Sequence, residues 1–221
     1  MFLGHYAVAL AAKRAAPATS LGALFFASVF VDLLWPFLLL SGVERARVEA
    51  QLPGLVPLVF EHYPVSHSLL MVCVWALLLG GAVFLAAGER RGAAVVAALV
   101  VSHWLLDALA HRPDLLLAPG GELRVGLGLW DAPVASVATE LGLFAAGLLL
   151  YLRATPRQRR WPLWTLSALL LAIFVGQLLG PPPPSISAVA WVGFAQWLLV
   201  GAGWWVDRPG GRRPAAVSPV P

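Results

Sequence analysis

Charged residues are scarce in this chain of 221 residues. Asp, Glu, Lys and Arg make up 12% of it and hydrophobic residues 60%, whereas a soluble domain carries about 25% charge. This composition leaves no room for a separate soluble domain and indicates a membrane protein. The net charge of +4 does not indicate nucleic-acid binding, because the basic residues form short clusters between apolar runs instead of an aromatic-interleaved face.

Cysteine is almost absent as well. Cys73 is the single cysteine, and it lies inside an apolar run. The sequence therefore excludes a disulfide framework and a metal site made of thiolates. Imidazole and carboxylate groups would have to bind any metal ion.

Long apolar runs occupy most of the chain, each close to the ~20 residues that cross a bilayer. They lie near residues 21–40, 67–88, 93–110, 131–152, 162–180 and 185–206. We therefore predict an all-α fold, a polytopic transmembrane helical bundle with about six long spans plus a short N-terminal helix. The stretch from Met1 to Ala12 lacks the basic segment with which a signal peptide begins, and Lys13 and Arg14 come after it. We therefore expect it to be retained and not cleaved as a signal peptide. It would dip into one leaflet or lie in the interface.

The basic residues between the runs predict the orientation. If the six runs alternate in direction, eleven Lys and Arg fall on one side and four on the other. We expect the first side, which includes the C-terminus, to be cytoplasmic, and the connections near 41–66 and 111–130 to cap the outer end. The expected regions are a membrane core at 1–152 with the His and Asp residues, two further transmembrane helices at 153–207 and a disordered cytoplasmic tail at 208–221.

Four ionisable residues lie inside the apolar runs: Asp32, His103, Asp107 and Glu140. A charge near the bilayer centre costs about 2.5–3.5 kcal/mol on insertion scales, so such residues usually mark a site. All histidines fall in the same half of the expected bundle, whichever way it is inserted. They are His5, His62, His67, His103 and His111.

The strongest local pattern is the pair His103 and Asp107. Four residues apart, they share one helix face, and His111 continues the stripe one turn further. Imidazole nitrogen and carboxylate oxygen suit zinc, manganese or iron. Three explanations stay open: the acids share a cation, they line a water-filled path, or they are protonated and hydrogen-bonded. His103 and Asp107 can also be a purely structural pair, and Asp32 can relieve a kink at Pro36.

Several motifs in order resemble those of a known family. They are Gly4-His5, then Asp32, then the segment from His62 to Ser68, then Ser102-His103 with Asp107. Over about residues 1–150 this order resembles the bacterial membrane-bound metal-dependent hydrolase family, also called domain of unknown function 457. The chain departs from the family pattern at Leu33 and Leu34, which follow Asp32, and at Tyr63, which stands where the family usually has Arg. The resemblance implies a bacterial inner-membrane protein with a divalent metal ion.

The ligands expected for this ion are His5, Asp32, His67, His103 and Asp107, with His62 and His111 at the periphery. Zinc is the expected metal, with manganese and iron as alternatives. The site would lie towards the outer face of the membrane. Because the second Asp and the His that the family usually has in this segment are missing after Asp32, we expect one ion in place of several.

If the protein is an enzyme, it would hydrolyse a phosphoester or another amphiphilic substrate with water activated by the metal. Glu61, His62 or Glu140 would then act as the base. The expected partners are the lipid bilayer and a small or lipid-like substrate, without nucleic acid, and the oligomeric state is left open. Two alternatives remain: a transporter in which the buried Asp, His and Glu form an ion or proton path, and a structural metal that only holds the N-terminal helix.

Overall fold

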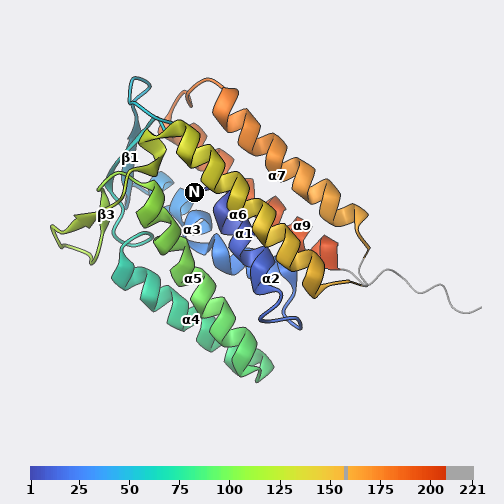
Figure 1. Ribbon diagram of the computed structural model, residues 1–221. Coiled ribbons are helices and arrows are strands. Elements are labelled where there is room, and N and C mark those ends of the chain that lie inside the picture. The colour runs from blue at the N-terminus through green and yellow to red at the C-terminus, as the bar shows by residue number, and fades with distance from the viewer. Residues whose placement is uncertain (157–158, 208–221) are drawn as a thin grey trace, which may run out of the picture.

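The computed structural model describes residues 1–156 and 159–207, and it confirms the helical bundle. Four single helices are long and apolar enough to cross a membrane: α4 (Leu69–Ala87), α5 (Arg90–Ala110), α6 (Pro133–Ala154) and α7 (Trp161–Leu179). A fifth span, Ile186–Asp207, consists of α8 (Ile186–Phe194) and α9 (Gln196–Asp207). Figure 1 shows α4, α5, α6 and α7 running along a common direction.

The first expected span is broken in two. Helices α2 (Leu21–Ser28) and α3 (Phe30–Leu40) meet at Val29 with a bend of 52°. Pro36 lies inside α3, yet the bend falls at Val29, one residue after α2 ends. The Ser28 carbonyl at this break accepts a hydrogen bond from the side chain of His103 in α5. The break therefore makes a backbone acceptor available to a side chain of another span.

The helix ends follow local sequence signals. The Ser68 hydroxyl accepts from the backbone N–H of Met71 at the start of α4, and Gly88 ends this helix in the left-handed conformation that glycine tolerates. The Glu89 carboxylate caps the start of α5. His67, just before α4, and His103, on α5, therefore belong to two antiparallel helices joined by a short turn.

Two short hairpins cap one end of the bundle. Strand β1 (Arg45–Val48) pairs with β2 (Leu58–His62), and β3 (Leu115–Leu116) pairs with β4 (Arg124–Val125), both antiparallel. A short 3₁₀ turn, η1 (Leu129–Asp131), leads into α6. Figure 1 shows both hairpins at the same end, where the sequence predicted capping connections but no strands.

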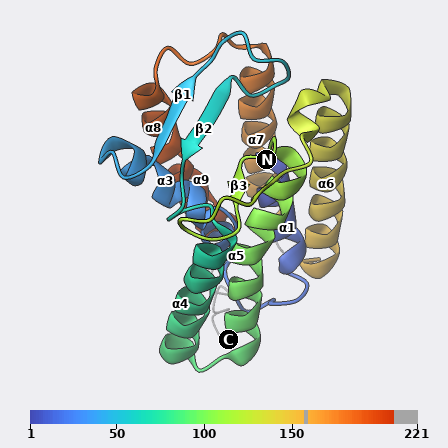
Figure 2. The same cartoon turned by 90° about the vertical axis from the view of Figure 1, so that its left-hand side faces the viewer.

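Helix α1 (Leu3–Ala12) lies inside the bundle instead of in the interface. It packs chiefly against α6 and also contacts α2 and α5 (Figure 2). Leu3, Tyr6 and Ala9 are fully buried. At Gly147 of α6 a Cβ atom would lie 2.3 Å from the carbonyl oxygen of Ala7, so the absence of a side chain lets the two backbones touch.

An ion pair closes the opposite end. Lys13, one of the eleven basic residues on the side expected to be cytoplasmic, is buried, and its Nζ lies 2.5 Å from Oδ2 of Asp207 at the end of α9. The same oxygen accepts from the backbone N–H of Leu21. Helix α9 packs along α2, so the last span is tied to the first ones. The expected tail at 208–221 lies outside the described residues.

Candidate metal centre

The predicted stripe on α5 is present. The carboxylate oxygen Oδ2 of Asp107 lies 2.9 Å from Nε2 of His103 and 4.0 Å from Nε2 of His111. His111 follows directly after the last residue of α5. Asp107 therefore stands between two histidines, one helical turn to either side.

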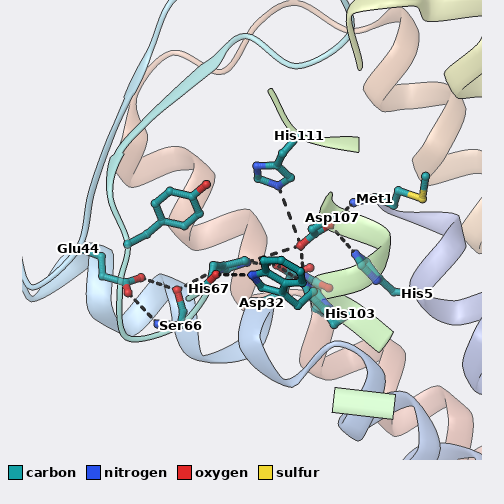
Figure 3. Close-up of polar contacts among 12 residues, drawn as sticks. Met1, His5, Asp32, Glu44, Ser66, His67, His103, Asp107 and His111 are labelled. Carbon is teal, nitrogen blue, oxygen red and sulfur yellow. Dashed lines mark hydrogen bonds and ion pairs between the residues drawn. The ribbon is translucent and has the colours of Figure 1, made fainter. Parts of the chain in front are cut away.

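Asp32 of α3 and His67, just before α4, approach this stripe from the other side. The Asp32 Oδ1 atom lies 3.4 Å from Nε2 of His67 and 3.6 Å from Nε2 of His103. His67 Nε2 is also 3.9 Å from Asp107 Oδ2. Figure 3 shows these side chains converging from three elements.

His5 of α1 completes the group. Its ring stacks on that of His103 at a centroid distance of 3.7 Å, and its Nε2 lies 3.2 Å from Oδ1 of Asp107. The amino group of Met1 is 2.7 Å from the same oxygen. We call the following five residues the His/Asp cluster: His5, Asp32, His67, His103 and Asp107. The structure thus brings all five expected ligands together.

The cluster is closed to its surroundings except at one residue. The side chains of His5, His103 and Asp107 are 1–3% exposed and that of His67 is 5% exposed. Asp32 is 25% exposed. Asp32 is therefore the member of the cluster that is most accessible from outside.

The state of His103 follows from its hydrogen bonds. Its Nδ1 lies 2.7 Å from the Ser28 carbonyl oxygen, which can only accept, so Nδ1 carries a hydrogen. Within the described part of the chain, Nε2 has no hydrogen-bond partner, although Asp107 Oδ2 is only 2.9 Å away. The oxygen is close but not in the direction of a hydrogen bond. A cation between the two atoms would satisfy both.

The spacing of the cluster suits one small cation. Zinc binds nitrogen and oxygen at about 2.0–2.2 Å, which sets neighbouring ligand atoms about 3–4 Å apart. The four distances that join Nε2 of His67 or His103 to Asp32 Oδ1 or Asp107 Oδ2 run from 2.9 to 3.9 Å. Two candidate triads, His5/His103/Asp107 and Asp32/His67/His103, share His103. Its single free ring nitrogen can bind only one ion.

Two of the three expected bases lie elsewhere. Glu61 and His62 are exposed on β2, and Glu61 Oε1 lies 3.3 Å from Nε of Arg47. Glu140 of α6 is buried near the cluster, but its carboxylate accepts from the backbone N–H groups of Phe2 and Gly4. It therefore holds the start of α1 in place.

A histidine that the sequence placed at the periphery has a well-defined environment. His111 Nδ1 lies 3.0 Å from Oδ1 of Asp114, which also accepts from the hydroxyl of Tyr63. The rings of Phe60 and Trp130 flank it at 4.8 and 4.1 Å. Burial lowers the pKa of His111 more than Asp114 raises it, so its imidazole is neutral at pH 7 and Nε2 is free towards Asp107.

Sequence reasoning missed the residues that hold the histidines. Asp114, Glu44 and Ser66 were not among the candidates, and each contacts a histidine or a neighbour of one. Asp114 lies only three residues after His111, in the loop that follows α5, so this short spacing is a signal that was available. For Glu44 the sequence holds no such signal, because its partners lie 21 and 22 residues further along the chain.

Comparison with known proteins gives one family. Residues 1–181 match the model of the family described as YdjM inner membrane protein. No curated protein and no solved structure matches the chain. The match extends beyond the 1–150 stretch of the expected resemblance and includes the whole His/Asp cluster.

Proposed function

The chain belongs to the YdjM inner membrane protein family, and from this premise we propose that it is a multi-pass inner-membrane hydrolase that depends on a divalent metal ion, with zinc as the first candidate. The family match and the apolar helices support the inner membrane as its location. Activity and metal are our proposal. The substrate class that we propose is a phosphoester or another amphiphilic molecule.

One observation carries this proposal. Two carboxylates and three imidazoles meet in a buried group in which acceptor atoms face one another, and His103 Nε2 is left without a hydrogen-bond partner among the described residues. Buried charge is normally paired or bound to a metal. The Met1 amino group pairs with one of the two carboxylates, Asp107, and carboxylate oxygens with imidazole nitrogens form a donor set that suits zinc, manganese or iron.

His103 and Asp107 would hold the ion, with Asp32, His67 and His5 available to complete its coordination. A bound divalent ion supplies a Lewis acid and lowers the pKa of water towards about 7. Asp32 is the most exposed of the five, so the open position of the site would be on its side. The stacking of His5 on His103 restricts the orientation of both rings.

His111 is our candidate for the proton acceptor. A general base needs a neutral nitrogen within reach of the reacting water, directly or through one further water. The imidazole of His111 is neutral, Asp114 fixes its Nδ1–H, and Nε2 lies 4.0 Å from Asp107 Oδ2. We prefer it to Glu61 and His62, because those side chains are exposed on β2.

The surroundings of the cluster favour hydrolysis over transport. On the side away from the hairpins lie the fully buried apolar residues Leu24 and Phe25 of α2 and Val100 of α5, and the buried hydroxyl of Ser28 donates to the Phe25 carbonyl. An ion path would need polar groups or water across this layer. The cluster is therefore better suited to a substrate that arrives from one side.

The substrate class follows from this position. The cluster lies in the half of the bundle capped by the hairpins, and its exposed member Asp32 belongs to a membrane-spanning segment. Phe37, five residues further along α3, is 52% exposed. A molecule with a polar ester and an apolar tail fits both features.

The proposal is tested first by metal content. We expect the detergent-purified protein to contain near-stoichiometric zinc, manganese or iron by plasma mass spectrometry, and Asp32→Asn and His103→Ala to lose it. Asp32→Asn keeps the shape of a partly exposed side chain, so it addresses the site even if His103→Ala does not fold. The control is Glu122→Gln, at an exposed residue. Wild-type protein that takes up none of these metals after reconstitution overturns the proposal.

Activity is the second test. Metal-loaded protein in lipid nanodiscs is offered a panel of phosphoesters and carboxylic esters with short and long acyl chains. We expect turnover of at least one long-chain phosphoester that is lost in Asp32→Asn. A fully loaded protein that hydrolyses nothing in the panel contradicts the hydrolase and leaves a structural metal.

A further inference from the structure

Glu44 is a buried carboxylate outside the His/Asp cluster. It lies between α3 and β1 and is only 1% exposed. Its Oε1 accepts from the backbone N–H groups of Val65 and Ser66, each at 2.8 Å, and its Oε2 accepts from the Ser66 hydroxyl at 2.6 Å. A carboxylate accepts hydrogen bonds and donates none, and this one accepts three.

Ser66 connects this carboxylate to the cluster. Its Oγ lies 2.6 Å from Glu44 Oε2 and 2.6 Å from Nδ1 of His67 (Figure 3). A hydroxyl has one hydrogen. Since the hydrogen goes to the carboxylate, the Ser66 oxygen must accept from Nδ1–H of His67.

The consequence lies on the other side of the ring. A neutral imidazole that carries its hydrogen on Nδ1 has a lone pair on Nε2. In His67 this nitrogen lies 3.4 Å from Asp32 Oδ1 and 3.9 Å from Asp107 Oδ2. The lone pair is therefore available within the cluster.

We propose that Glu44 and Ser66 are positioning residues, which fix His67 in the Nδ1–H tautomer and hold its Nε2 ready to bind a divalent cation. The chain Glu44–Ser66–His67 is an outer layer of the site, in which a carboxylate acts on a ligand through a hydroxyl group. Such partners fix the tautomer and orientation of metal-binding histidines. The part that concerns the metal rests on the proposed function, whereas the tautomer does not.

These three residues do not form a nucleophilic triad. In such a triad the histidine lies between the serine and the acid, whereas here the serine lies between the acid and the histidine. Ser66 is fully buried, and its hydrogen is directed to Glu44. The Ser66 hydroxyl therefore serves to orient His67 and not to act as a nucleophile.

The backbone around His67 has separate supports. The indole N–H of Trp75 donates to the Val65 carbonyl at 2.9 Å, and that of Trp104 donates to the His67 carbonyl at 3.0 Å. The Ser68 hydroxyl donates to the Pro64 carbonyl. Removing the Ser66 hydroxyl should therefore alter the ring of His67 and leave the segment folded.

The tautomer is measured in metal-free protein by ¹⁵N NMR of the histidine rings, with His67→Gln used to assign the signal. We expect wild-type His67 to be the Nδ1–H form. In Glu44→Gln the amide NH₂ donates to Ser66 Oγ, which frees the hydroxyl hydrogen for Nδ1 and moves the ring hydrogen to Nε2. We expect Ser66→Ala to give a mixture of tautomers and Ser66→Thr to restore the wild-type form.

The controls are matched in residue type. Glu122→Gln changes an exposed carboxylate and Ser167→Ala a buried hydroxyl in α7, and both should leave the His67 signal unchanged. A general loss of structure would change the spectrum without inverting a tautomer. An Nε2–H form in the wild type, or an unchanged form in Glu44→Gln, overturns the inference.

Zinc affinity is the second readout. Loss of such an outer partner typically weakens metal binding about 10–100-fold, and we expect this for Glu44→Gln and Ser66→Ala in a competition assay with a zinc dye. Unchanged affinity in both variants overturns the positioning role. If the wild type binds no zinc, the proposed function fails, and the tautomer experiment still decides the inference about Glu44 and Ser66.

Discussion

Three histidines around Asp107 share one arrangement at the level of single residues. Each has its Nδ1 held from outside, His103 by the Ser28 carbonyl, His67 by Ser66 and His111 by Asp114, and each has Nε2 towards Asp107. The three holding groups are chemically different and come from different parts of the chain. The shared orientation directs the three Nε2 atoms to one side, which is what the proposed metal centre would require.

Glu140 gives a prediction at the same scale. Its carboxylate accepts from Phe2 N at 2.9 Å and from Gly4 N at 2.8 Å, so it compensates the unpaired N–H groups that begin α1. In Glu140→Gln the negative charge is lost. The amide NH₂ that replaces one carboxylate oxygen can only donate, so one of the two backbone N–H groups loses its acceptor. We expect the free energy of unfolding to fall by about 1–3 kcal/mol, measured by denaturant titration in detergent.

The outcome separates two roles of Glu140. If it is an anchor, Glu140→Gln lowers stability while the folded fraction keeps its rate of hydrolysis at saturating metal. A rate that falls at unchanged stability would instead support Glu140 as a base. Glu122→Gln, at an exposed position, should change neither quantity.

At the level of elements, helix α1 is a short helix that depends on its neighbours for stability. It is too short to span the bilayer by itself, with 10 residues and a length of about 15 Å. It is stable inside the bundle because its apolar residues are covered on several sides by α6, α2 and α5. Because α1 contributes His5, the packing of α1 sets the position of one expected ligand.

Gly147 provides the test of this packing. A Cβ at this position of α6 would lie 2.3 Å from the Ala7 carbonyl oxygen, a contact with backbone that cannot move aside cheaply. In Gly147→Ala the helices α1 and α6 must separate. We expect a loss of about 1–3 kcal/mol in stability and weaker metal binding, because His5 is two residues from Ala7.

The control lies on the same helix. Gly142 of α6 has no atom within 4 Å of its Cβ position in the described structure. Gly142→Ala should therefore be neutral or slightly stabilising, since alanine favours the helix by about 1 kcal/mol. Equal destabilisation by both substitutions would show that the close contact of α1 and α6 is not what the glycine provides.

For the whole molecule, the two ends of the bundle differ in chemistry. One end has the hairpins and the His/Asp cluster. The other has the turn between α4 and α5 with Arg90 and Arg91, and the buried pair of Lys13 and Asp207. Lys and Arg residues near the ends of membrane spans are enriched on the cytoplasmic side. We therefore expect the end with the His/Asp cluster to face outwards.

This orientation is checked by labelling in spheroplasts. After Cys73→Ser removes the native thiol, single cysteines are introduced at Ser41, near the hairpin end, and at Arg91, on the opposite end; both residues are exposed. We expect a membrane-impermeant maleimide to react with Ser41→Cys and to spare Arg91→Cys until the membrane is opened. The reverse pattern would place the cluster towards the cytoplasm.

The sequence by itself determined which segments are long and apolar enough to span a membrane, although not the break at Val29, together with the stripe of His103 and Asp107 and the gathering of the expected ligands in one half of the bundle. These features are local: hydrophobic length fixes a span, and a period of 3.6 residues fixes which side chains share a helix face. The order of the runs then decides at which end each histidine lies.

The tertiary structure alone decided how the cluster is held. Glu44 meets Ser66 across 22 residues, Tyr63 meets Asp114 across 51, and Glu140 meets Gly4 across 136. It also places Glu61 and His62 on an exposed strand and turns Lys13 from a surface charge into a buried ion pair. Such contacts arise when separate helices and loops pack, and no spacing along a single segment encodes them.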